Sequence, residues 1–191
     1  MLKYYYGTMA SGKSASLLMN AYQKKINNVD NIVLKPNEKR DKSKIKSRVG
    51  LERDCLVFKS TTDLYTFIKN LRDNMDVKYF YIDECQFLTP KQVHQLWECT
   101  RELGVQICCF GLKTNFKNEL FEGVKTLMVY ADSIQELEPK SVCKYCEENA
   151  TTHLLIVNNE PVLEYPEKFE GDVKGNIRYE CVCQKCWHDN I

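Results

Sequence analysis

The sequence predicts an α/β fold in which a mostly parallel sheet carries helices on both faces and is followed by a small metal-binding subdomain. Three observations lead to this prediction. Short β-prone runs alternate with segments of helical periodicity up to about residue 139, a pattern typical of a covered parallel sheet. A glycine-rich turn joins the first strand to the first helix, and two CxxC pairs lie near the C-terminus.

The first elements read as strand, turn and helix. Lys3 to Tyr6 is a β-prone run that ends at Gly7, and apolar residues at helical spacing follow from Ser14. The lysine-rich stretch Lys35 to Arg48 is expected to be a loop. Further strands are expected at Asn31–Leu34, Cys55–Phe58, Tyr79–Asp83 and Val105–Phe110, and helices at Leu64–Leu71 and Pro90–Leu103. We expect residues 1–139 to form the α/β domain and residues 140–191 the metal-binding subdomain.

Composition limits the classes of protein to consider. The chain has 191 residues, 43% of them hydrophobic, which is enough for one core and a small appendage. Its 27 lysines and arginines balance 26 acidic residues, so no global basic field draws it onto nucleic acid, and no nucleic-acid partner is expected. No stretch approaches the roughly 18 apolar residues of a membrane span, and the N-terminus lacks the apolar core of a signal peptide. We therefore expect a cytoplasmic protein.

GTMASGKS, from Gly7 to Ser14, fits the GxxxxGK[ST] pattern of a phosphate-binding loop (P-loop) between a strand and a helix. Its backbone N–H groups and the helix N-terminus would cradle phosphates. Lys13 would reach the β- and γ-phosphates of ATP, and the Ser14 hydroxyl would ligate Mg²⁺. The alternative is an ordinary glycine turn with a capping serine.

The second motif is a pair of acidic residues that follows the hydrophobic run Tyr79 to Ile82. Asp83 ends a strand in the manner of a Walker B aspartate and is expected on the Mg²⁺ side of the P-loop. Glu84 comes next, at the sheet edge where ligands bind in open α/β folds, and is expected to take a proton from an attacking hydroxyl. The alternative is that both residues are solvated acids in a turn.

The cysteines fall into two groups. Five are scattered among apolar neighbours, and the other five lie in the last quarter of the chain. Of these, Cys143, Cys146, Cys183 and Cys186 form two CxxC pairs in the pattern of a structural Zn²⁺ site. A site of four thiolates has no open coordination position, so this zinc would staple the subdomain and do no chemistry. Cys181 or His188 is an alternative ligand in place of one of the four.

Two further features receive no firm role. His94 and His153 stand alone in the sequence, and a lone histidine is more often packed or exposed than catalytic. The basic residues between positions 39 and 48 could clamp phosphates, but a charge run is usually a solvated face. This cluster consists of Lys39, Arg40, Lys42, Lys44, Lys46 and Arg48.

Taken in order, the motifs resemble the cellular-type (type II) thymidine kinases over nearly the whole chain. The resemblance rests on GTMASGKS, Lys35-Pro36, Ser47–Leu51, DECQF at Asp83–Phe87, GLKTNFKNELF at Gly111–Phe121 and YECVCQKC at Tyr179–Cys186. It implies ATP- and Mg²⁺-dependent phosphorylation of the 5′-hydroxyl of thymidine or deoxyuridine, with Glu84 as general base. It also implies a homotetramer and feedback inhibition by dTTP.

The resemblance further implies a lasso loop, held by the zinc subdomain, that covers an apolar slot for the base. The matching slot residues are Met9, Phe87, Leu112, Phe116, Phe121 and Tyr179. The residues expected to bind nucleotide are Gly7, Thr8, Met9, Ala10, Ser11, Gly12, Lys13, Ser14, Asp83, Glu84, Cys85, Gln86 and Arg40. Arg40 matches the arginine that follows Lys-Pro in the family when one residue is deleted.

The sequence departs from the family pattern at three places. Asp172 and Lys174 stand in the lasso where small or apolar residues are usual, and Lys113 replaces the aspartate common after Gly-Leu. Base selectivity and catalytic rate are therefore left open. Two other functions are alternatives to the kinase. One is a nucleic-acid-dependent ATPase, but such a motor needs a second sheet domain, for which this chain is too short. The other is a nucleotide sensor without turnover.

Overall fold

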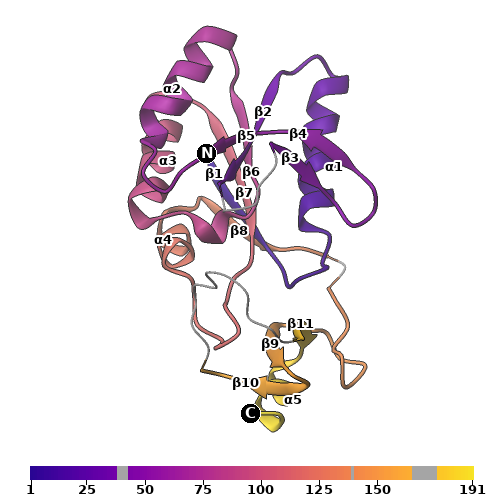
Figure 1. The fold of residues 1–191 in the computed structure, drawn as a ribbon. Helices are drawn as coiled ribbons and strands as arrows, with labels where there is room; N and C mark the ends of the chain where they lie inside the picture. Colours follow the sequence, from indigo (N-terminus) through magenta and orange to yellow (C-terminus); the bar gives the residue numbers. More distant parts are fainter. Residues whose placement is uncertain (38–42, 139, 165–175) are drawn as a thin grey trace.

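The computed structural model describes residues 1–37, 43–138, 140–164 and 176–191. Within these ranges the chain forms an α/β body and, below it in Figure 1, a smaller C-terminal unit made of residues 140–164 and 176–191. The domain boundary expected at residue 139 falls on a residue outside the described ones. None of the described helices is long and apolar enough to cross a membrane.

The body is built on a six-stranded sheet in the order β5-β2-β6-β7-β1-β8, and every neighbouring pair is parallel. The central strands are apolar and buried, as the four buried residues at the start of β2 illustrate, because helices cover both faces. The strands are β1 Leu2–Tyr6, β2 Asn31–Pro36, β5 Leu56–Phe58, β6 Tyr79–Ile82, β7 Gln106–Gly111 and β8 Ser133–Glu136. The parallel sheet with helices on both faces confirms the predicted fold class.

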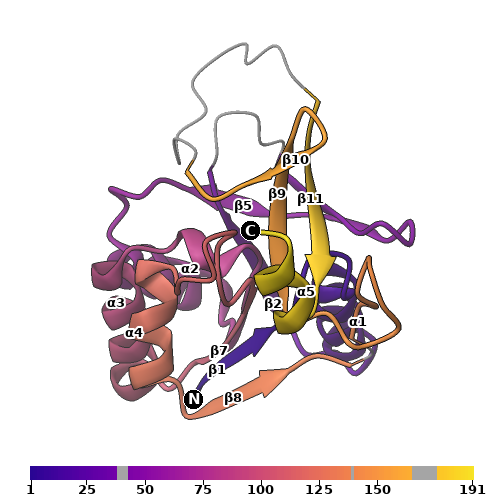
Figure 2. The ribbon, with the colours of Figure 1, turned by 90° about the horizontal axis from the view of Figure 1, so that it is seen from below.

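Figures 1 and 2 show helices on both faces of this sheet, and each face carries its own hydrophobic core. On one face α1 (Lys13–Ile26) buries Leu17, Leu18 and Ala21 against the sheet. On the other face lie α2 (Leu64–Met75), α3 (Pro90–Glu102) and α4 (Glu122–Tyr130), with a short 3-10 turn, η1 (Cys85–Phe87), beside α4. The sequence predicted α1, α2 and α3 but neither α4 nor β8.

Helix starts follow local chemistry. Thr89 and Gln92 form a reciprocal capping box at the start of α3, with Pro90 at its first position, and Asp63 caps α2 by accepting a bond from the N–H of Thr66. The start of α1 differs, because its N-cap is Gly12 in the left-handed conformation (φ 77°) and has no side-chain cap. The first N–H groups of α1 are therefore left for another acceptor.

Part of the stretch expected to be a loop is a hairpin. β3 (Lys44–Lys46) pairs antiparallel with β4 (Glu52–Asp54), while β2 runs on through Pro36. Ile45 is buried in the hydrophobic core between α1 and the sheet, and the flanking lysines form ion pairs with Glu52. The expectation of a loop was wrong for these residues because one buried isoleucine between two lysines gives little hydrophobic pattern.

The C-terminal unit contains a three-stranded antiparallel sheet in the order β10-β9-β11. Its elements are β9 Thr152–Val157, β10 Glu160–Val162, β11 Ile177–Val182 and α5 Gln184–Asp189. Asn158 and Asn159, both with positive φ, make the tight turn between β9 and β10. A small core of Leu154, Ile156 and Val182 packs against the cysteines of the CxxC pairs.

Candidate active site and metal centre

The P-loop lies at the carboxyl edge of the parallel sheet, between β1 and α1. Ala10 and Gly12 both adopt positive φ, 63° and 77°, so the backbone turns sharply before the helix. Lys13 Nζ donates to the Thr8 carbonyl at 2.6 Å. Burial lowers the pKa of Lys13, while the charges of Glu84 and Asp83 oppose that shift.

The acidic pair reaches the P-loop from β6, which is separated from β1 by β7. Ser14 Oγ donates to Asp83 Oδ2 at 2.9 Å. Burial, and then the charge of Glu84, raise the pKa of Asp83 to about 6, although the bond from Ser14 acts in the opposite direction. A buried carboxylate beside a serine hydroxyl is the oxygen donor set that Mg²⁺ requires, so these residues fit the ion.

Glu84 is held by its own chain. It has φ 52°, an uncommon conformation for a residue with a side chain, which turns it out of the strand. Gln86 Nε2 donates to Glu84 Oε2 at 2.6 Å, and Gln86 Oε1 accepts from the backbone N–H of Leu112 at 3.1 Å. A Cβ on Gly111 would lie 2.5 Å from Gln86 Oε1, so glycine is needed there to admit the amide. Gln86 thus fixes the carboxylate of Glu84.

A cavity of about 240 Å³ brings these groups together. Glu84, Lys13 and Leu112 line it, with the turn that joins β3 to β4 on one side. The complete lining is Met9, Ala10, Gly12, Lys13, Ser14, Ala15, Lys46, Ser47, Arg48, Val49, Glu84 and Leu112. A cavity with a helix N-terminus, a buried lysine and a carboxylate suits a phosphate ester and a group that loses a proton.

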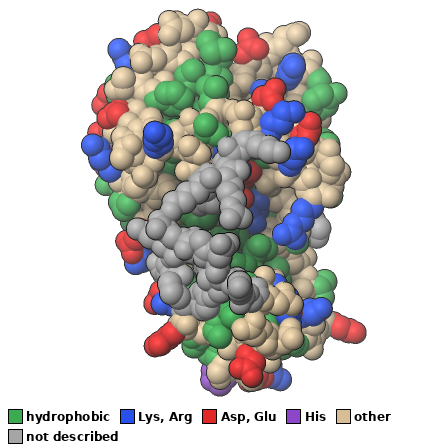
Figure 3. Space-filling view, viewed as in Figure 1, with side chains coloured by type: hydrophobic (Ala, Val, Ile, Leu, Met, Phe, Trp, Pro, Cys, Tyr) green, Lys and Arg blue, Asp and Glu red, His purple; other side chains and the backbone are tan. Residues whose placement is uncertain are grey.

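The basic cluster is only partly a solvated face. Lys46 and Arg48 line the cavity, while Lys44 and Lys46 pair with Glu52 at 3.3 and 3.0 Å. Figure 3 shows lysine and arginine side chains interspersed with acidic ones near the β3–β4 hairpin. Lys39, Arg40 and Lys42 lie outside the described residues. Within the described ranges, Arg48 makes no side-chain hydrogen bond or ion pair, so its charge is free to meet a ligand.

The six predicted slot residues fall into two sets. Met9 and Leu112 line the cavity. The other four form two aromatic pairs outside it: Phe87 with Phe121, at 6.1 Å between ring centroids, and Phe116 with Tyr179, at 6.5 Å. The lasso residues Asp172 and Lys174 lie outside the described residues.

Four of the remaining predicted nucleotide-binding residues do not line the cavity: Gly7, Thr8 and Ser11 of the P-loop, and Cys85. Gly7 leaves no room for a side chain, because a Cβ there would lie 2.4 Å from Ser11 Oγ. The hydroxyl of Ser11 is buried and has no partner among the described residues, whereas the Thr8 carbonyl accepts the bond from Lys13. Cys85 is fully buried beside Gly111 and does not line the cavity.

Three residues that the sequence did not link to the P-loop form hydrogen bonds with it. Met9 N–H donates to His153 Nε2 at 2.8 Å, and the Met9 carbonyl accepts from Ser141 Oγ at 2.9 Å and from Cys181 Sγ at 3.1 Å. All three partners belong to the C-terminal unit. The sequence contained no signal for them, because a contact between residues 144 positions apart leaves no local pattern.

The two CxxC pairs meet as the spacing predicted. Their four sulfurs all lie within 4.8 Å of one another, and Cys146 Sγ is 3.7 Å from both Cys183 Sγ and Cys186 Sγ. A tetrahedral ion with bonds of about 2.3 Å holds its sulfurs about 3.8 Å apart, so the geometry fits Zn²⁺. Burial raises the pKa of Cys143, but backbone hydrogen bonds outweigh it and lower the pKa to about 6, whereas burial and then the neighbouring thiols raise the pKa of Cys186 to about 12. The case for the metal therefore rests on the distances between the sulfurs.

The two alternative ligands are not in this cluster. Cys181 bonds to the P-loop, and the exposed ring of His188 lies 3.4 Å from Asp189. The candidate ligands are therefore the four cysteines of the two CxxC pairs, which would fill all four coordination positions of a tetrahedral ion. The cluster joins the segment before β9 to the segment after β11 and so ties the two ends of the C-terminal unit together.

Comparison with known proteins agrees with the geometry. The model of the family described as "Thymidine kinase" matches residues 1–187. A thymidine kinase of Photorhabdus laumondii is 34% identical over 192 residues, which cover 100% of this chain and 93% of the relative. A thymidine kinase of Streptococcus agalactiae is 36% identical over 96% of this chain and 95% of its own length. One from Haemophilus influenzae is 34% identical, over 96% and 93%.

Substitution of one clustered cysteine tests the metal centre. We expect the protein to carry about one zinc ion per chain and Cys146→Ser to lose most of it, because three thiolates bind zinc less tightly than four. Cys181→Ser is the matched control and should keep its zinc. Metal content by inductively coupled plasma mass spectrometry checks both, and equal loss in the two variants would show that the ligand set is wrong.

Proposed function

The chain belongs to the thymidine kinase family, and on that premise we propose that it transfers the γ-phosphate of ATP to the 5′-hydroxyl of thymidine or deoxyuridine. The observation that carries the proposal is the shared cavity, in which Glu84 faces the P-loop lysine and the start of α1. A phosphate donor and a hydroxyl acceptor would meet there. The product, a nucleoside monophosphate, feeds nucleotide salvage for DNA synthesis.

Phosphate binding falls to the P-loop. The uncapped start of α1 offers backbone N–H groups to the phosphates, and Lys13 supplies a positive charge at their centre. Arg48 adds a second charge from the β3–β4 turn. Ser14 and Asp83 would hold Mg²⁺, which neutralises charge on the β- and γ-phosphates when bound. Arg40, outside the described residues, is proposed as a further nucleotide ligand on the family resemblance alone.

Glu84 is the proposed general base. It accepts the proton of the 5′-hydroxyl while that oxygen forms a bond to the γ-phosphorus and the bond from phosphorus to the β-phosphate oxygen breaks, which releases ADP. Gln86 keeps the carboxylate oriented through its bond to Oε2. Most of the rate enhancement comes from positioning and charge, because phosphoryl transfer requires little covalent work from the protein.

The base of the nucleoside is proposed to lie against Met9 and Leu112, the two slot residues in the cavity. Phe87, Phe116, Phe121 and Tyr179 would complete the slot, since aromatic faces stack on a pyrimidine. The C-terminal unit, residues 140–191 in our division of the chain, carries the lasso and is stapled by Zn²⁺ when the ion is bound.

We also propose a homotetramer in the cytoplasm. Met19, Tyr22 and Ile26 are exposed on one face of α1, at the spacing i, i+3 and i+7, and Met128 and Val129 are exposed on α4. These exposed apolar residues support contact between copies of the chain. None of the ten cysteines forms a disulfide bond, as expected in a reducing compartment.

Light scattering tests the tetramer. It should give about four times the mass of 22.4 kDa, and Tyr22→Lys should lower this mass. A monomeric wild-type protein would contradict the tetramer.

Replacement of Glu84 by Gln tests the proposed chemistry. Gln keeps the shape but cannot accept a proton, so we expect thymidine-dependent formation of ADP and thymidine monophosphate to fall by at least about 10²-fold. Glu98→Gln on α3, remote from the cavity, is the matched control and should retain its activity. If the rate of ADP release does not increase with thymidine, or increases only with other nucleosides or with DNA, the proposed substrate is wrong.

A further inference from the structure

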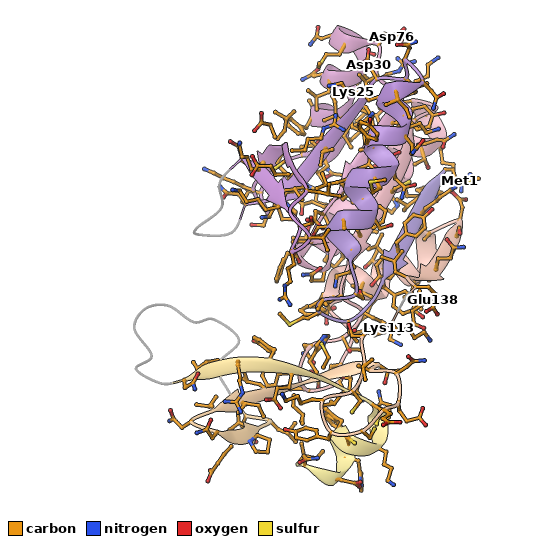
Figure 4. All side chains as sticks on the ribbon, turned by 90° about the vertical axis from the view of Figure 1, so that its right-hand side faces the viewer. Met1, Lys25, Asp30, Asp76, Lys113 and Glu138 are labelled. Atoms are coloured by element: carbon orange, nitrogen blue, oxygen red, sulfur yellow. The ribbon has the colours of Figure 1, made fainter. Side chains whose placement is uncertain are left out.

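Both backbone polar groups of Met9 are held by the C-terminal unit. Its N–H donates to His153, and its carbonyl accepts from Ser141 and Cys181. These partners come from three segments: the stretch before the first CxxC pair, β9 and β11. The backbone of Met9 is therefore one of the places where the body meets the C-terminal unit. Figure 4 shows the two units side by side, with Lys113 and Glu138 labelled near their junction.

His153 is suited to accept this hydrogen bond. Its side chain is buried, opposite Cys181 in the β9–β11 pairing. A small cavity beside the ring is lined by Lys113 and Glu136, and Lys13 acts on the ring from the P-loop. Burial, and then the charge of Lys13, lower the pKa of His153 to about 4, so the ring is neutral at pH 7 and Nε2 keeps the lone pair that accepts the bond.

The position of the Met9 peptide determines the shape of the phosphate site. The N–H that His153 binds shares a peptide group with the Thr8 carbonyl, which accepts bonds from Lys13 Nζ and from the Ser11 N–H. The Met9 carbonyl belongs to the next peptide, which leads into the left-handed turn at Ala10. A rotation of the Thr8–Met9 peptide would move the carbonyl that binds Lys13 Nζ and would change the direction of the N–H groups that follow. Donors that are fixed before binding cost less to organise around an anion.

We propose that His153 is a positioning residue of the phosphate site, which holds the Met9 peptide so that the P-loop is preorganised for the triphosphate. Nucleotide affinity then depends on a side chain of the C-terminal unit that does not touch the nucleotide. This inference rests on the proposed ATP-binding function of the P-loop. Loss of the bond leaves the partly buried N–H of Met9 without this partner and frees the Thr8–Met9 peptide to rotate.

Three substitutions test the role. His153→Gln places an amide oxygen near the position of Nε2 and keeps an acceptor, His153→Asn is polar but too short to reach Met9, and His153→Leu fills the space without an acceptor. We expect Leu and Asn to raise the KM for ATP, and the dissociation constant of Mg·ADP measured without thymidine, by about tenfold. Gln should stay near the wild-type values, and the KM for thymidine should change less than that for ATP.

Ile156→Val is the control, because it trims a buried residue of the same strand that packs away from the P-loop. It should lower the melting temperature without weakening nucleotide binding. Equal nucleotide affinity in the Gln and Asn variants would overturn the positioning role, even if His153→Leu fails to fold. So would a Leu variant that is less stable but binds Mg·ADP like the wild type. A wild-type protein that binds no ATP would instead refute the proposed function.

Discussion

The hydrogen bond from Ser14 to Asp83 is the interaction on which the site depends, because it joins the P-loop to the acidic pair across the sheet. It is possible only because the strands run parallel, so that the turns after β1, β6 and β7 all end at one edge. That edge receives the start of α1, Glu84 and Leu112 in a single cavity. The neighbouring Glu84 is then fixed by Gln86, whose other end is bound by the N–H of Leu112 after β7.

The C-terminal unit adds a second constraint at the same loop. Its cysteine cluster ties the segment before β9 to the end of β11, and the same segments supply Ser141 and Cys181 to the Met9 carbonyl. Trp187 reaches further, since its ring N–H donates to the carbonyl of Phe116 at 3.2 Å. A unit stapled in this way can hold both the phosphate loop and the aromatic residues beside the cavity without contributing a catalytic group.

The sequence predicted what short-range patterns encode. The P-loop, the strand before Asp83 and the CxxC pairs each have a fixed spacing, and the structure places the first two at one cavity and the last in one cluster. Contacts between distant segments left no such pattern, so His153 was assigned no role, and the β3 strand was missed because only Ile45 is buried there. Cys181 was considered only as a metal ligand, because its bond to Met9 depends on how the two units pack.

The most direct test of the account is a crystal structure with thymidine and a non-hydrolysable ATP analogue. We predict that the 5′-oxygen lies about 3 Å from the Glu84 carboxylate, with the γ-phosphate between that oxygen and Lys13. A nucleoside bound outside the cavity, or one whose 5′-oxygen points away from Glu84, would contradict the proposed chemistry.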